Sequence, residues 1–140
     1  MTRRSAPAAR LLDANALIAL AIGDHVHHRR VALWLARAEC FALCPMVEGA
    51  LVRYVVRLGG HPATATGFLE AVNSDPRCQF WPDSLTYREA AMGHVEGHRQ
   101  VTDAYLAALA AQRQGGRLAT LDAALAAALP AAVELIPAVA

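Results

Sequence analysis

The chain has no lysine, and all 13 of its basic residues are arginine. Any mechanism that depends on a lysine amine is therefore excluded. The formal net charge is only +1, so the chain is not a protein that holds nucleic acid by overall charge alone. Any basic surface that attracts phosphate would have to be a local patch of arginines.

Cysteines and long apolar runs are also scarce. Cys40, Cys44 and Cys78 form an odd set without a CxxC pair, which predicts reduced thiols in a cytoplasmic protein and no disulfide framework. The apolar run after the N-terminus contains Asp13 and Asn15 and is far shorter than a membrane span. We therefore expect no signal peptide, no transmembrane helix and no membrane partner.

What is present suits one globular domain. The chain has 140 residues, of which 56% are hydrophobic and 18% charged, and much of the apolar excess is alanine, which suits closely packed helices. This length closes one core and is too short for two. We expect a single domain over residues 1–140, with its core at about 10–136.

Apolar patterning alternates between short runs and helical stripes. The predicted strands are RLLDAN, 41–44, 78–81, 117–120 and 133–136; the predicted helices are 24–38, 45–58, 62–73, one opened by Ser84, 103–114 capped by Thr102, and 122–129. Strands separated by helices, with no hairpin signal, predict a mostly parallel sheet covered on both faces, a three-layer α/β/α fold. In such folds the working site lies beyond the carboxyl ends of the strands.

Four acidic residues lie in unusually apolar surroundings: Asp13 in LLDAN, Glu48 in PMVEGAL, Asp103 in VTDAYLAAL and Asp122 in LATLDAAL. Two follow predicted strands and two lie at helix N-termini, so all four could meet at one sheet edge. Each one taken singly could also be only a helix cap or a turn residue. Four clustered carboxylates need a cation, and oxygen ligands suit Mg²⁺ or Mn²⁺. Asn15 and Thr120 would orient the ligands.

The ordered set LLDANALIAL, Glu48, TDAYLAALA and LATLD resembles PIN-domain ribonucleases, most closely the VapC-type toxins of bacterial type II toxin–antitoxin systems. The resemblance implies that Asp13, Glu48, Asp103 and Asp122 bind one or two Mg²⁺ or Mn²⁺ ions. It also implies metal-dependent endoribonuclease activity on a structured RNA such as tRNA or rRNA, leaving a 5′-phosphate and a 3′-hydroxyl. The resemblance further implies that the protein forms a homodimer and is silenced by a cognate antitoxin whose tail enters the active site. Leu121 departs from the family, which often has an aromatic residue there.

Other residues have weaker functional signals. Arg29, Arg30, Arg53 and Arg57 could guide phosphates, and Arg99, beside the helix that bears Asp103, is the first candidate for RNA contact. For any single arginine a solvated surface position is the alternative. The histidines His25, His27 and His28 suit a solvated helix start better than a zinc site, and glycines near His94 and His98 weaken any helix there. Trp34 and Trp81 fit the core better than a base-stacking surface.

Rival functions remain open at this stage. Phospho-accepting receiver domains and haloacid-dehalogenase-like phosphatases also cluster carboxylates around Mg²⁺, but both use a lysine, and the phosphatases also need DxD where this chain has DxN. A non-catalytic PIN-like module that binds RNA or protein is the main alternative. Because all four acidic residues are present, we favour the enzyme.

Overall fold

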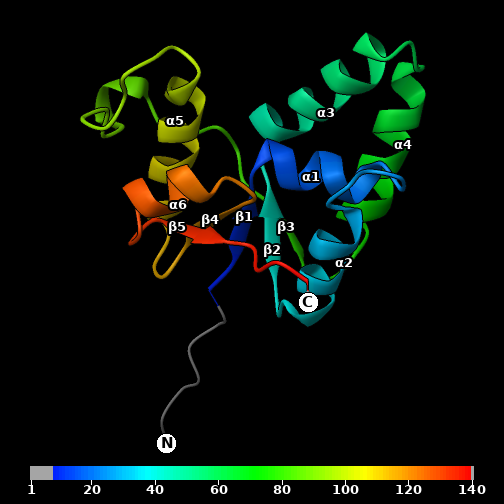
Figure 1. Cartoon of the computed structure of the whole chain (residues 1–140), viewed down its shortest axis with the longest axis horizontal. Coiled ribbons are helices and arrows are strands. Elements are labelled where there is room, and N and C mark those ends of the chain that lie inside the picture. The colour runs from blue at the N-terminus through cyan, green and yellow to red at the C-terminus, as the bar shows by residue number, and fades with distance from the viewer. Residues whose placement is uncertain (1–7, 140) are drawn as a thin grey trace, which may run out of the picture.

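The computed structural model describes residues 8–139 and contains one five-stranded sheet (Figure 1). The strands run in the order β3-β2-β1-β4-β5, and every neighbouring pair is parallel. The strands are β1 Arg10–Leu12, β2 Phe41–Leu43, β3 Cys78–Phe80, β4 Arg117–Thr120 and β5 Val133–Leu135. The helices are α1 Ala14–Ala21, α2 His28–Arg37, α3 Pro45–Arg57, α4 Pro62–Asn73, η1 Tyr87–Glu89, α5 Gln100–Ala111 and α6 Ala123–Ala128.

The sheet is buried because helices cover it on two sides. Helices α5 and α6 pack over β1, β4 and β5, whereas α1 to α4 lie on the other side (Figure 1). In the central strand β1, Leu11 and Leu12 are both fully buried, as expected for a parallel strand with helices on both faces. The predicted three-layer α/β/α fold is therefore confirmed.

The strand order reverses between β1 and β4. From β1 the chain adds β2 and then β3 on one side, and it returns to place β4 and β5 on the other. In open α/β sheets, ligands bind outside the carboxyl ends of the strands at such a reversal. Asp13 directly follows β1, and Thr120 is the last residue of β4, so two predicted site residues lie at this point.

Four local predictions were wrong. The segment after Asp13 forms helix α1, which begins at Ala14, so the strand ends at Leu12 and Asn15 is helical. The uniformly apolar run ANALIALA hides the helical period, since polar residues do not mark its outer face. Likewise, residues 24–27 are not helical and α2 begins only at His28.

The other two errors fall between β3 and α5. The segment after Ser84 contains only the short 3₁₀ helix η1, because Pro82, Gly93 and Gly97 punctuate it. The N-cap of α5 is Arg99, so Thr102 lies inside the helix and does not cap it, and the helix ends at Ala111.

No helix within residues 8–139 is long and apolar enough to cross a bilayer. The expectation of no signal peptide rests partly on residues 1–7, which lie outside the described residues. No disulfide joins the three cysteines; Cys40 and Cys44 are buried and Cys78 is partly exposed.

Candidate active site

Asp13 is a buried carboxylate held by two donors. Its side chain is the N-cap of α1, where Oδ1 accepts the Ala14 backbone N–H at 2.7 Å. Its Oδ2 accepts the hydroxyl of Thr120 at 2.7 Å, across the β1–β4 pair. Asp13 is only 4% exposed, so these contacts replace water and fix both oxygens at the carboxyl end of β1.

The side-chain oxygen of Thr120 connects several residues of the site by hydrogen bonds. While it donates to Asp13, its Oγ1 accepts the Asn15 side-chain Nδ2 at 3.1 Å and the Asp122 backbone N–H at 3.1 Å. The Asn15 Oδ1 in turn accepts the Leu121 backbone N–H at 3.1 Å. Thr120 is fully buried. The network connects α1 to the turn after β4 and holds the Asp13 carboxylate through Thr120.

Asp122 and Asp103 flank this network. Asp122 caps α6, with Oδ1 accepting the Leu125 backbone N–H at 3.1 Å, and it is exposed. Asp103 lies in the first turn of α5 and is half-buried. Acidic side chains are favoured at both positions by unpaired backbone N–H groups and by the helix dipole.

Burial and mutual repulsion perturb the carboxylates. The pKa of Asp13 is raised to about 6, first by burial and then by the nearby Asp103 and Asp122, against the opposing hydrogen bond from Thr120. The pKa of Asp103 is also raised, first by burial and then by Asp122, while His94 acts in the opposite direction. The three aspartates therefore form one electrostatic unit.

A small pocket of about 70 Å³ opens beside two of these aspartates. It lies between α5 and α6 and is lined by His94, Gln100, Asp103, Asp122, Ala124, Leu125 and Ala128. The Nε2 atom of His94 is buried and has no hydrogen-bond partner among the described residues. Sequence reasoning missed this placement because His94 lies in a glycine-containing segment without periodicity, where no pattern indicates which way a side chain points.

Glu48 is not part of this cluster. It lies in the first turn of α3, as expected, but its Oε2 accepts the side-chain Nδ2 of Asn73 at 3.2 Å. Asn73 also donates to the Leu69 carbonyl at 2.8 Å, which fixes it at the end of α4. The structure thus brings together three of the four predicted carboxylates. Within residues 8–139 no group of three or more His, Cys, Asp or Glu side chains is preformed to hold a metal ion.

The donor set nevertheless fits a hard divalent cation. Asp13, Asp103 and Asp122 offer only oxygen atoms, the ligands that Mg²⁺ and Mn²⁺ prefer. The buried Asp13 carboxylate lies beside two further acids, and no basic side chain within residues 8–139 hydrogen-bonds to it. A bound cation would offset the repulsion from Asp103 and Asp122, which adds to the effect of burial on the pKa of Asp13.

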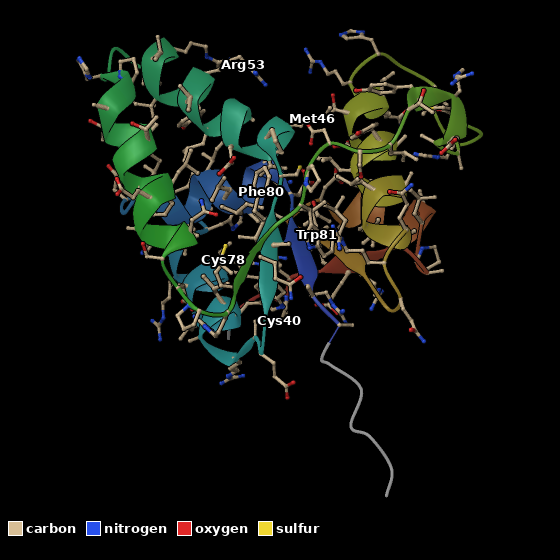
Figure 2. All side chains as sticks on the ribbon, turned by 180° about the vertical axis from the view of Figure 1, so that it is seen from behind. Cys40, Met46, Arg53, Cys78, Phe80 and Trp81 are labelled. Atoms are coloured by element: carbon tan, nitrogen blue, oxygen red, sulfur yellow. The ribbon has the colours of Figure 1, made fainter. Side chains whose placement is uncertain are left out.

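The predicted RNA-contacting arginines are exposed. Arg99 is the N-cap of α5, and Arg53 projects from α3 (Figure 2). Arg30 instead donates to the Ile136 carbonyl. Trp81 is buried, with the Arg113 guanidinium 4.3 Å from the centre of its ring, so its predicted core position is confirmed.

The histidines at the start of α2 make local contacts. The His25 Nδ1 accepts the His27 backbone N–H at 3.0 Å, and the His28 Nδ1 lies 2.9 Å from the Ala19 carbonyl. These contacts fit a helix start.

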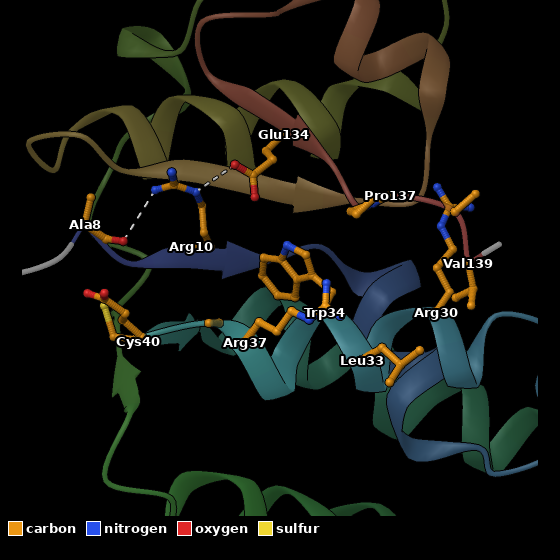
Figure 3. Close-up of a pocket in the computed structure, with 13 residues that line it drawn as sticks. Ala8, Arg10, Arg30, Leu33, Trp34, Arg37, Cys40, Glu134, Pro137 and Val139 are labelled. Atoms are coloured by element: carbon orange, nitrogen blue, oxygen red, sulfur yellow. Dashed lines mark hydrogen bonds and ion pairs between the residues drawn. The ribbon is translucent and has the colours of Figure 1, made fainter.

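A second pocket, of about 700 Å³, is separate from the aspartates (Figure 3). It lies between α2 and the end of the chain and includes Trp34, which is partly exposed. At its floor, Glu134 accepts from Arg10 at 3.2 Å and from Arg117 at 3.3 Å. No predicted site carboxylate lines it.

Comparison with known proteins decides the family, because the PIN domain model matches residues 10–128. The chain belongs to the PIN-domain family. This PIN domain is 51% identical over 117 residues to Ribonuclease VapC29 of Mycobacterium tuberculosis (strain ATCC 25618 / H37Rv), covering 83% of this chain and 87% of the relative. It is 41% identical over 126 residues to Ribonuclease VapC39 of the same strain, covering 83% and 90%.

A solved structure supports the same fold. The crystal structure of VapC20 of Mycobacterium tuberculosis, described as a toxin that cleaves the sarcin–ricin loop, matches with a TM-score of 0.67. The match covers 86% of this chain and 95% of that chain at 19% identity. The resemblance to VapC-type PIN domains is therefore confirmed, and the receiver and phosphatase alternatives are excluded.

Proposed function

We propose that this PIN domain is an endoribonuclease toxin of the VapC type that hydrolyses RNA phosphodiester bonds with Mg²⁺ or Mn²⁺. The observation that carries the proposal is the contact of Thr120 with Asp13 beside Asp103 and Asp122, at the reversal point of the sheet. Relatives named ribonucleases, which match most of the chain, support it.

Each residue has a distinct part in this chemistry. When bound, the divalent ion lowers the pKa of water and neutralises charge on the phosphate oxygens. Asp13, Asp103 and Asp122 would hold it, with Asp13 fixed by Ala14 and Thr120. Asn15 keeps the Thr120 hydroxyl directed at Asp13. Glu48 would complete the predicted quartet after its side chain leaves Asn73.

The proposal extends to partners and location. The substrate would be a structured RNA, tRNA or rRNA, contacted by Arg99 and Arg53 on the surface. A cognate antitoxin would silence the enzyme, and two copies would form a homodimer. The three cysteines form no disulfide, which agrees with a protein that works in the reducing cytoplasm.

Cleavage of total bacterial RNA by the purified chain tests the proposal. With Mg²⁺ or Mn²⁺ we expect discrete new 5′ ends, and with EDTA we expect none. D13N should abolish cleavage while circular dichroism shows a folded protein, because the amide removes the ligand charge with little change in shape. The matched control is D24N, which alters an exposed aspartate outside the cluster and should cleave like the wild type.

Two outcomes would contradict the proposal. Full cleavage by a folded D13N protein would show that the aspartate cluster is not needed for catalysis. Absence of cleavage by the wild type, together with absence of metal binding in a calorimetric titration, would favour the non-catalytic binding module.

A further inference from the structure

The pocket between α5 and α6 has few hydrogen-bond donors that could bind a phosphate. Asp103 and Asp122 are acceptors when ionised, and within residues 8–139 no lysine or arginine lines the pocket. Only two of its side chains, His94 and Gln100, can donate a hydrogen bond. Because an RNA phosphate offers only acceptor oxygens, it needs donors as well as a cation to lie beside these carboxylates.

Gln100 is partly committed to the loop that precedes its helix. Its Oε1 accepts the backbone N–H groups of Glu96 and Gly97, at 2.6 and 3.1 Å. These bonds hold the segment that carries His94 against the start of α5. The backbone that follows His94 is therefore held close to the first turn of α5.

The His94 side chain lines the pocket, but one of its ring nitrogens lacks a hydrogen-bond partner. Its Nε2 is buried without a hydrogen-bond partner within residues 8–139, and leaving a buried polar atom unpaired is unfavourable. The ring also acts electrostatically on Asp103. With a volume of about 70 Å³, the pocket has room for about two water molecules. It can admit phosphate oxygens, whereas a nucleobase is too large.

We propose that His94 is a substrate-binding residue of this site, whose Nε2 donates a hydrogen bond to a phosphate oxygen of the RNA held between α5 and α6. This inference rests on the proposed ribonuclease function. It assigns a contact to a residue outside the acidic quartet and explains why a buried ring nitrogen lacks a partner.

Binding and cleavage by His94 variants test the inference. The probe is a labelled RNA oligonucleotide that spans the cleavage site mapped in the experiment above. Its Kd is measured by fluorescence anisotropy with Mg²⁺ present, on RNA whose scissile phosphodiester is replaced by a non-hydrolysable phosphonate, so that cleavage is prevented while all aspartates stay intact. We expect H94A to weaken RNA binding about tenfold or more, since hydrogen bonds to charged groups contribute that much. In the cleaving protein, H94A should raise KM.

The controls separate this contact from other roles. H94Q keeps an N–H donor and should recover part of the RNA affinity, and H98A changes an exposed histidine of the same loop and should bind like the parent. Mn²⁺ affinity, measured by titration, should be the same for H94A and wild type. If H94A does not fold, the comparison of H94Q with H98A decides.

Unchanged RNA affinity in folded H94A would overturn the inference, and so would a loss of Mn²⁺ binding, which would make His94 a metal ligand. Neither outcome affects the proposed ribonuclease function. That function fails separately, when the wild type does not cleave or D13N does.

Discussion

Asp13 uses its two carboxylate oxygens for different purposes. Oδ1 caps α1, whereas Oδ2 lies at the carboxyl end of β1 and accepts the Thr120 hydroxyl. The capping and ligand interpretations of this residue therefore do not compete. The same is true of Asp122, whose Oδ1 caps α6 while the residue also lines the pocket beside Asp103.

The raised pKa of Asp13 predicts the pH dependence of stability in EDTA. Because folding raises this pKa from 3.8 to about 6, the folded state binds the proton more tightly than the unfolded chain. The contribution to stability is thus full below pH 4 and is lost as the pH rises to about 6. We expect wild type to lose about 1–3 kcal/mol more than D13N over this range.

Urea unfolding of both proteins at several pH values measures this difference. Parallel curves for wild type and D13N would show that the Asp13 carboxyl does not titrate in this window.

At the scale of elements, sequence patterns predicted the sheet well. The strand positions, the parallel order of neighbours and the edge where Asp13, Thr120 and Asp122 lie all follow from short apolar runs that end in polar residues. Helix α1 was not predicted because its residues are almost all apolar and show no helical period. The segment of η1 escaped because proline and glycine remove periodicity.

Side-chain direction limited the prediction of the site. Pattern placed Glu48 correctly at the start of α3, but a contact with Asn73, 25 residues later in the chain, directs its carboxylate elsewhere. His94 enters the pocket through the fold of an irregular loop. Such contacts depend on tertiary packing, which local periodicity does not encode.

The turn from α5 to β4 connects Asp103 with Thr120 and depends on Gly116. A Cβ at this position would lie 2.3 Å from the Ala110 carbonyl oxygen and 3.1 Å from that of Arg113. Since backbone atoms cannot move aside cheaply, we expect G116A to destabilise the protein by more than about 2 kcal/mol. Chemical denaturation measures the loss.

The matched control is G97A, where a Cβ would meet nothing within 4 Å. Its free energy of unfolding should stay close to that of the wild type. Equal stability of G116A and G97A would show that the turn relaxes without cost.

For the whole molecule, a ligand that binds only the folded state raises stability by mass action. At a free metal concentration of 100 times Kd, the expected gain is about 2.7 kcal/mol. Removal of Mg²⁺ or Mn²⁺ with EDTA should therefore lower the Tm of wild type by several degrees. Differential scanning calorimetry should show little such change for D13N, and an equal shift in both proteins would locate the effect outside the aspartate cluster.

The strand order also determines when during synthesis the site can exist. Asp13 is made early, but the hydroxyl that holds it belongs to β4, and Asp103 and Asp122 come from the last third of the chain. A growing chain that has left the ribosome only as far as β3 lacks Thr120 and both of these aspartates. Under the proposed function, the enzyme would therefore stay inert during most of its own translation, and no active nuclease would be present beside the ribosome that makes it until β4 has emerged and paired with β1.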